Sequence, residues 1–474
     1  MAERRLSPAD AAWLYSEWDK NNQTVSSLMW LDREIDPAVF TALVQERIVD
    51  KYPTFSQRLR LSRNPLMMPH WEDDPDFDIA HHIEVLHLPA PGSKAQLADL
   101  VSEQRGDLLD RDRPLWKMYV IQGYEGNTTA IHSRIQHSIA DGWALVRLVL
   151  SLCDDRENIE RPTTVDKQRP RKRDIMGKVM DPVTSVVRHP TDALEETLSI
   201  ALHPKRFIEF GTDLFGDAKD TTGETAEAAK NALEFLFSPR PGKTILHGRV
   251  TGAKKVDWID PIPLQQIKDI GRAQGATIND VLLAVLTNAL RKYLVEKDAL
   301  TVDDLFTAMP VSLRSPKADL PRTLGNRFGL VPVLLPVGIA DPVEQLLEIK
   351  RRVDDLKESQ MPIVSFGLIS VSALATPDVE RLIHLVNQDH SIGVTTNVPG
   401  PRHSIYVAGG RVLGSWGMGG LSGNMNLSFG IYTLDGMLNF AVHSDTGITD
   451  DPERILHFFL ESIEDLKAEV LETA

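Results

Sequence analysis

Apolar and polar positions along this chain follow strand periods and helix periods in turn. Residues 128–136 alternate, with Ile131 and Ile135 on one side and Arg134 on the other, which predicts a strand. After a tight turn, apolar side chains recur at helical spacing through Leu150. Strands and helices that succeed one another in this way favour an α/β fold.

The same rules predict elements on both sides of a polar middle segment. Ser7-Pro8 begins a short helix as N-cap and first helical residue, and Thr277 caps a longer one. Asp435-Gly436 predicts a tight hairpin turn. Further strands are expected at 23–31, 83–88, 116–122, 305–309, 329–335, 392–397, 426–432 and 437–442, and further helices at 39–49, 263–273 and from Asp451-Pro452 onward.

The length of the chain and its patterning predict two domains. The 474 residues exceed what one core comfortably holds. We expect an N-terminal domain at 1–153 and a C-terminal domain at 244–474. Charged and small polar residues dominate the segment between them, 154–243, which is expected to be a partly helical connection. It contains the basic run Lys167–Arg173, which either contacts anionic groups or is a solvated loop.

Composition narrows the class of protein. Apolar residues make up 42% and the net charge is −15, which indicates a globular protein and argues against nucleic acid as a partner. The single cysteine, Cys153, allows no internal disulfide and suits a reducing compartment. No signal peptide is evident, and apolar stretches are shorter than the roughly 20 residues of a membrane span. We therefore expect a cytoplasmic protein whose contact with lipid is peripheral.

The most informative segment is QHSIADG, at residues 136–142. His137 ends a predicted strand before a tight turn, where its near-neutral pKa suits it to take a proton from a hydroxyl and return one. Asp141 can fix the loop or pair with an arginine, and Gly142 leaves the backbone unobstructed.

The bare spacing of His and Asp is weak support, because short patterns recur by chance. His70 and Asp74 repeat it without the glycine or a following helix. Taken alone, a histidine such as His137 is more often structural than catalytic. The chain has no G-x-S-x-G serine elbow and no glycine-rich phosphate loop, so serine hydrolysis and ATP use are not indicated.

QHSIADG resembles the HHxxxDG signature of the CoA-dependent acyltransferase superfamily. Its surroundings resemble, more narrowly, the wax ester synthase/diacylglycerol acyltransferase family. The blocks that carry this resemblance occur in the family's order: LSPADAAWLY, DRPLWKMYVIQG, GATINDVLLAV, MPVSLR, LGNRFG, TNVPGPR and YVAGGRVL.

The resemblance implies two chloramphenicol-acetyltransferase-like α/β domains with the active site in a tunnel between them. It implies that His137 is the catalytic base and that Asp141 is structural, with Arg314 as the candidate arginine partner. Gln136 stands where the family has its first histidine. It either only shapes the site or tunes the imidazole of His137, and strand alternation, which points the two side chains in opposite directions, favours the first.

Two further sets of residues are candidates. Asn279, near a predicted helix start, is a candidate donor to the oxyanion of the reaction, or it simply occupies the first helical turn. Pro114, Leu115 and Trp116 are implied to line the acyl tunnel, although Trp116 could instead begin a buried strand. The adjacent His81-His82 pair faces opposite ways on a strand, so no metal site is expected.

The expected activity is transfer of a long-chain acyl group from acyl-CoA to a fatty alcohol and/or diacylglycerol, giving wax esters and/or triacylglycerols. No cofactor besides the acyl-CoA substrate is implied, and peripheral contact with a membrane or lipid inclusion is expected. Two alternatives stay open. One is a related acyltransferase that takes its acyl group from a carrier protein, and the other is a non-catalytic lipid-binding relative.

Overall fold

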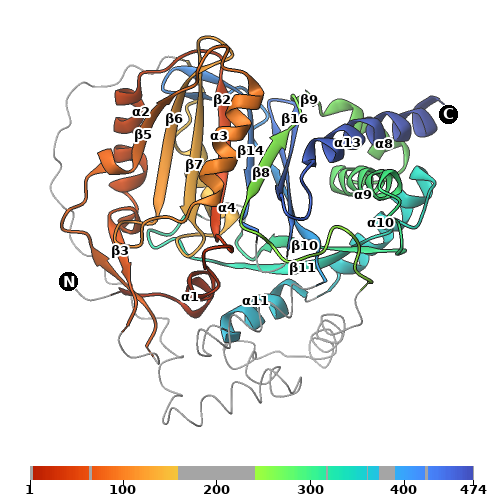
Figure 1. Ribbon diagram of the computed structural model, residues 1–474, viewed down its shortest axis with the longest axis horizontal. Coiled ribbons are helices and arrows are strands. Elements are labelled where there is room, and N and C mark those ends of the chain that lie inside the picture. The colour runs from red at the N-terminus through yellow and green to blue at the C-terminus, as the bar shows by residue number, and fades with distance from the viewer. Residues whose placement is uncertain are drawn as a thin grey trace, which may run out of the picture.

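The chain forms two α/β lobes that lie side by side, as the computed structural model shows (Figure 1). The structure describes residues 4–62, 67–157, 241–315, 319–359, 361–372, 390–421 and 425–472. The expected connection at 154–243 lies outside the described residues except at its two ends, and the basic run Lys167–Arg173 lies wholly outside them.

The first lobe is built on a six-stranded sheet with the order β13-β14-β2-β7-β6-β5. Helix α3 packs on one face of the sheet, and α1, α2 and α4 contribute to the core on the other. The strands are β2 (Thr24–Leu31), β5 (Ile83–His87), β6 (Trp116–Tyr124), β7 (Thr128–Gln136), β13 (Tyr406–Val407) and β14 (Gly410–Met418), and the helices are α1 (Pro8–Tyr15), α2 (Pro37–Val44), α3 (Lys94–Gly106) and α4 (Gly142–Leu150).

The second lobe is built on a mixed sheet with the order β11-β10-β12-β15-β16-β8, and β9 also pairs with β16. Helices α8, α9, α10 and α13 pack their apolar sides into the main core of this lobe, and α11 packs on β11 and α1. The strands are β8 (Lys254–Trp258), β9 (Ile262–Pro263), β10 (Leu305–Ser312), β11 (Phe328–Leu335), β12 (Gly393–Pro399), β15 (Leu427–Leu434) and β16 (Met437–Asp445), and the helices are α8 (Gln265–Ala273), α9 (Ile278–Glu296), α10 (Pro342–Lys357), α11 (Met361–Ser372) and α13 (Pro452–Lys467). None of the helices in the described ranges combines the length and hydropathy that crossing a bilayer requires.

Most of the predicted helices and strands are present. Where their bounds differ from the prediction, the cause is local. The helix expected at 39–49 is α2 followed by a π-helical turn at Gln45–Val49. Helix α8 begins two residues after the expected start because Ile262 and Pro263 pair with β16 as strand β9. At the predicted hairpin, Asp435 and Gly436 both have positive φ, as a type I′ turn requires.

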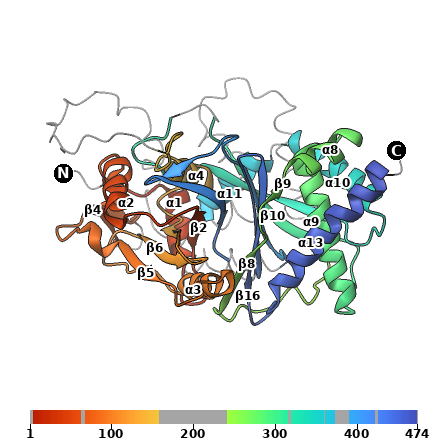
Figure 2. The same cartoon turned by 90° about the horizontal axis from the view of Figure 1, so that it is seen from above.

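Sheet membership does not follow the order of the chain. Strand β14 comes from the C-terminal part of the sequence, but it pairs antiparallel with β2 of the first lobe. Strand β14 also contacts β15 and β16 of the second lobe, and Figure 2 shows α3 of the first lobe beside β8 of the second. Strand β14 was not predicted from the sequence, although buried and more exposed residues alternate along it. This exchanged strand ties the two lobes together.

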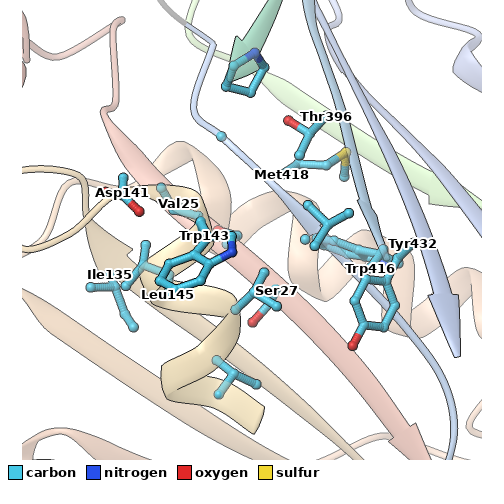
Figure 3. A pocket seen from close by; sticks show the side chains of 18 of the residues that line it. Val25, Ser27, Ile135, Asp141, Trp143, Leu145, Thr396, Trp416, Met418 and Tyr432 are labelled. Carbon is cyan, nitrogen blue, oxygen red and sulfur yellow. The ribbon is translucent and has the colours of Figure 1, made fainter. Parts of the chain in front are cut away.

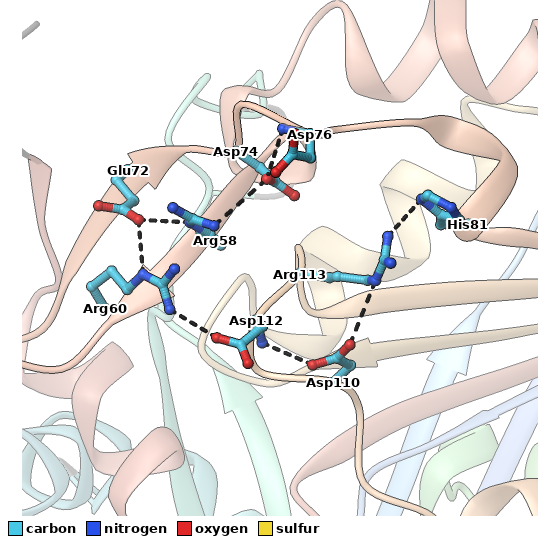
Figure 4. Close-up of polar contacts among 9 residues, drawn as sticks. All are labelled: Arg58, Arg60, Glu72, Asp74, Asp76, His81, Asp110, Asp112 and Arg113. Carbon is cyan, nitrogen blue, oxygen red and sulfur yellow. Dashed lines mark hydrogen bonds and ion pairs between the residues drawn. The ribbon is translucent and has the colours of Figure 1, made fainter.

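A small three-stranded sheet, in the order β1-β4-β3, lies at the edge of the first lobe. Its strands are β1 (Arg4–Arg5), β3 (Gln57–Arg60) and β4 (His70–Asp73). In Figure 4, Arg60 pairs with Glu72 at 2.8 Å and with Asp112 at 2.9 Å, and Arg113 contacts His81 at 2.5 Å. Such partly exposed pairs contribute at most about 1 kcal/mol each, so the network mainly orients the loop that precedes β6.

The close packing of β14 on β2 can be tested by substituting two glycines of β14. A Cβ at Gly414 would lie 2.1 Å from the Trp30 ring, whereas one at Gly417 would meet its nearest neighbour at 3.9 Å. We expect Gly414→Ala to lower the free energy of unfolding by about 1–3 kcal/mol through overpacking. Gly417→Ala, on the same strand, should have little effect. Thermal unfolding of both variants measures this, and equal stabilities would contradict the tight docking of β14 on β2.

Candidate active site

His137 is the first residue of the turn that joins β7 to α4. Its backbone N–H donates to the carbonyl of Gln23 at 2.9 Å, which anchors the turn to the start of β2. The residue is only 9% exposed. Its imidazole stacks on Trp13, with ring centroids 4.3 Å apart, and Phe328 of the second lobe contacts both rings. The ring is therefore held by aromatic side chains from both lobes.

Asn326 connects this imidazole to Asp10. The amide oxygen of Asn326 lies 2.9 Å from His137 Nδ1, and its amide nitrogen donates to the His137 carbonyl at 2.7 Å and to Asp10 Oδ1 at 2.8 Å. The backbone N–H of Asn326 also donates to Asp10 Oδ1, at 2.7 Å. Asp10 lies in α1 and Asn326 in the loop before β11, so this cluster joins the two lobes.

Burial lowers the pKa of His137 below its ordinary value, and the hydrogen bonds to the ring and the negative charge of Asp141 oppose this effect. Taking a charged imidazolium out of water is costly, so the neutral ring is favoured at pH 7. A neutral imidazole can accept a proton.

Asp141 is the N-cap of α4 and pairs with Arg314. One carboxylate oxygen accepts from the Ala144 backbone N–H at 2.8 Å. The other accepts from Arg314 Nε at 2.9 Å and from the Arg327 backbone N–H at 2.9 Å. Arg314 Nη2 donates in turn to the carbonyl of Gly325 at 2.5 Å. The ion pair is almost fully buried and links the turn after β7 to the loop that carries Asn326.

Gln136 is fully buried and, unlike His137, does not line the cavity described below. Its amide nitrogen donates to the Trp13 carbonyl at 3.3 Å, and its amide oxygen accepts from the Ser138 backbone N–H at 2.5 Å. The side chain therefore supports the end of α1 and the turn that carries His137.

A cavity of about 250 Å³ lies between the lobes, and His137, Asp141 and Gly142 are in its wall. A Cβ at Gly142 would meet nothing within 4 Å, so the glycine keeps this part of the wall open. Figure 3 shows side chains of α4, β2 and β7 on one side and of β12, β14 and β15 on the other. The lining is mostly apolar. Side chains drawn there include Val25, Ile135, Trp143, Leu145, Trp416, Met418 and Tyr432.

Asn279 does not line this cavity. It occupies the first turn of α9, whose capping box is formed by Thr277 and Asp280, and its amide oxygen accepts from Asn397 Nδ2 at 3.0 Å. Asn397 is itself in the cavity wall. The expectation that Asn279 donates to the oxyanion stays a prediction, and Asn397 is the residue of this pair that lines the cavity.

Pro114, Leu115 and Trp116 do not line this cavity, and the tunnel role that the resemblance implied for them stays a prediction. Trp116 is 1% exposed, donates from Nε1 to the Phe55 carbonyl at 2.9 Å and stacks on His82. The indole finds its partners within the core of the first lobe, so packing accounts for this segment.

Other reactive groups do not form a second centre in the described ranges. Burial raises the pKa of the Cys153 thiol to about 12, which disfavours a thiolate nucleophile. His82 is buried with Nδ1 at 2.8 Å from the Trp116 carbonyl, whereas His81 is exposed. No group of three metal-ligating side chains is found among the described residues.

Four residues that contact His137 or its partners were not singled out from the sequence: Asp10, Trp13, Asn326 and Phe328. All four lie in LSPADAAWLY and LGNRFG, two blocks that carried the family resemblance. The resemblance located these blocks but did not assign a role to their side chains, because the two segments meet only in the folded chain.

Comparisons with known proteins agree with this architecture. Residues 6–282 match the wax ester synthase/diacylglycerol acyltransferase catalytic domain, and residues 324–467 match the WS/DGAT C-terminal domain. The chain is 27% identical to a putative diacylglycerol O-acyltransferase of Mycobacterium tuberculosis, over 98% of this chain and 90% of that protein. It is 29% identical to a probable diacylglycerol O-acyltransferase of the same organism, over 84% and 81% of the two chains.

Solved structures share the fold. The wax ester synthase/diacylglycerol acyltransferase from Marinobacter aquaeolei VT8 matches with a TM-score of 0.67 and 20% identity, over 98% of this chain and 99% of that one. The first condensation domain of the calcium-dependent antibiotic synthetase matches with a TM-score of 0.55 and 14% identity, over 99% and 96%. The predicted fold of two chloramphenicol-acetyltransferase-like α/β domains is thereby confirmed. With its lobes, its site and both family domains in place, the chain belongs to the wax ester synthase/diacylglycerol acyltransferase family.

Proposed function

We propose that this acyltransferase moves a long-chain acyl group from acyl-CoA to a fatty alcohol and/or diacylglycerol, with His137 as general base. The observation that carries the proposal is a buried imidazole in the wall of an apolar cavity between the lobes, where burial lowers its pKa and so favours the neutral ring. Nδ1 is engaged by Asn326, which leaves Nε2 as the ring nitrogen for a substrate hydroxyl.

In the proposed reaction, Nε2 of His137 takes the hydroxyl proton as the alcohol oxygen attacks the thioester carbonyl carbon. The tetrahedral intermediate then collapses, the carbon–sulfur bond breaks, and the imidazolium returns the proton to the CoA thiolate. General base action of this kind contributes roughly 10²–10⁴-fold to a rate. The reaction consumes no other reagent.

Stabilisation of the intermediate needs a donor near its oxyanion. Asn397 lines the cavity and contacts Asn279, so we assign Asn397 as the candidate donor. In this proposal Asn279 orients Asn397 and does not contact the substrate.

The shape and chemistry of the cavity support a lipid substrate. The wall includes apolar residues of α4 and, facing them, apolar residues from the C-terminal half of the chain. A wall of this kind suits an alkyl chain, because burying each methylene contributes about 0.8 kcal/mol. The residues of this apolar part of the wall are Trp143, Val146, Val149, Leu150, Ile405, Val412, Ile431 and Tyr432.

The role of His137 as the base can be tested by substitution. His137→Ala should lower CoA thiol release from palmitoyl-CoA, with hexadecanol or dioleoylglycerol as acceptor, to no more than a few per cent of wild type. Thin-layer chromatography of the products identifies which acceptor is used. As a control, His457→Ala replaces an exposed histidine of α13 and should leave the rate unchanged.

Retention of the wild-type rate by His137→Ala would exclude the base mechanism. Faster turnover with an acyl-carrier protein than with acyl-CoA would favour a carrier-dependent acyltransferase. Lipid binding without thiol release from either donor would favour the non-catalytic alternative.

We further propose that Asp141 and Arg314 act structurally. Asp141→Asn removes one charge of a buried pair, which typically costs about 3–5 kcal/mol, and should lower the melting temperature more than it lowers turnover of the folded enzyme. The matched control is Glu296→Gln, in an exposed pair with Arg454, which should cost at most about 1 kcal/mol. Abolished turnover at an unchanged melting temperature would contradict the structural role.

Finally, we propose that the protein works in the cytoplasm and reaches its lipid acceptor by peripheral contact with a membrane or lipid inclusion. A long-chain alcohol or diacylglycerol partitions into lipid, so the enzyme must meet a lipid surface to collect it. The basic run Lys167–Arg173 is the candidate contact in the sequence. In flotation with anionic vesicles, replacing Arg171, Lys172 and Arg173 by Gln should reduce binding, and unchanged binding would exclude this run.

A further inference from the structure

The hydrogen bonds around Asn326 determine which ring nitrogen of His137 carries the proton. The two hydrogens of the Asn326 amide point at acceptors, namely the carboxylate of Asp10 and the carbonyl of His137. Neither of these groups can donate when the carboxylate is ionised, so the amide nitrogen must face them. The amide oxygen then faces His137 Nδ1, 2.9 Å away, and an oxygen there can only accept.

We propose that Asn326 and Asp10 are positioning residues that hold His137 as its Nδ1–H tautomer, with the lone pair on Nε2 directed to the substrate. The inference rests on the proposed function for the use of that lone pair, but the tautomer itself can be tested without turnover. Which imidazole nitrogen is protonated is set by the hydrogen bonds of the ring. Here Nδ1 faces the Asn326 amide oxygen, and the ring also hydrogen-bonds the carbonyl of His137 itself.

Asp10 is well placed to fix the orientation of Asn326. It lies in the first turn of α1, where Ser7 Oγ donates to its Oδ2 at 2.7 Å and both the backbone and the side chain of Asn326 donate to its Oδ1. A reversed Asn326 amide would set its oxygen against that carboxylate. The carboxylate therefore acts on the imidazole through the amide and does not contact it.

The hydrogen bond between His137 and Asn326 makes the tautomer of His137 depend on both lobes. Gly325, next to Asn326, donates its backbone N–H to the Ile139 carbonyl at 3.0 Å, within the turn that follows His137. Gly325 has a φ of +81°, and a Cβ there would lie 3.3 Å from Asp10 Oδ2. The loop of the second lobe thus fits closely between α1 and the turn after β7, and the correct tautomer is selected only where the lobes are docked.

Other charged groups face this centre and contribute to its titration. Asp141 at the start of α4 favours the protonated imidazole, and Arg314 pairs with Asp141. Arg4 of β1 interacts electrostatically with Asp10. Because burial lowers the pKa of His137, the acid limb of kcat/KM in the wild type should have its midpoint below about 6.5. Activity is lost as the pH falls through that pKa, since a protonated imidazole cannot accept a proton.

The direct test is ¹⁵N NMR of the histidine side chains in the full-length protein at pH 7.5, because ¹⁵N shifts separate protonated from unprotonated ring nitrogens. The signal of His137, among 14 histidines, is assigned by its loss in His137→Gln. We expect a protonated Nδ1 and an unprotonated Nε2 in the wild type. In Asn326→Leu, which removes the side-chain acceptor and leaves only the carbonyl of His137 itself, we expect the Nε2–H tautomer to gain population and kcat to decrease roughly 10²–10⁴-fold.

Two conservative variants separate positioning from general damage to the fold. Asn326→Asp combined with Asp10→Asn, which replaces the facing carboxylate by an amide donor, places a negative charge at Nδ1, so the double variant should keep the tautomer and move the acid limb of kcat/KM to higher pH. Asp10→Asn alone keeps an acceptor for Asn326 and should retain far more activity than Asp10→Leu. Ser93→Ala removes the N-cap of α3, away from Asn326 and Asp10, so it should lower the melting temperature and leave the acid limb unchanged.

An Nε2–H tautomer in the wild type would overturn the inference even if every variant failed to fold. So would an acid limb that does not move when Asn326→Asp is combined with Asp10→Asn. Either result would leave the role of His137 as base to be decided by His137→Ala, so the failure of the positioning proposal and the failure of the proposed function are distinguishable.

Discussion

The site depends on one constraint, which is that an imidazole removed from water must still have its polar atoms satisfied. Burial favours the neutral ring that a general base requires, but it also makes an unpaired Nδ1 costly. Asn326 meets this requirement from the second lobe, and the nearby ion pair of Asp141 with Arg314 holds the same loop in place. The chemistry at His137 and the docking of the lobes are therefore parts of a single arrangement.

Each lobe completes the other. The second half of the chain supplies β14 to the sheet of the first lobe, and the loop that carries Asn326 fits against α1 and the turn after β7. The cavity wall consequently includes side chains from both halves of the chain, with His137 among them. An apolar site of this kind suits acyl transfer to a lipid alcohol, because water that reached the thioester would hydrolyse it.

The glutamine at the first position of the signature motif has a structural explanation. Gln136 bridges the Trp13 carbonyl and the Ser138 backbone N–H. The position needs one donor and one acceptor on the same side chain, and an amide provides both. This geometry fits the interpretation that the residue shapes the turn, and it leaves His137 as the group in the cavity wall.

The sequence alone was enough to determine most of the secondary structure and the position of His137 at a strand end. Strand alternation, N-caps such as Thr277 and the Asp435-Gly436 turn depend only on residues that are neighbours in the chain. The family blocks added the two-lobed fold. Only the tertiary structure decided that β14 joins the first sheet, that Trp116 packs in the core, that Asn397 and not Asn279 lines the cavity, and that Asp10 meets Asn326 across 316 positions. Contacts between distant segments arise from the packing of whole elements, and no local pattern of residues encodes them.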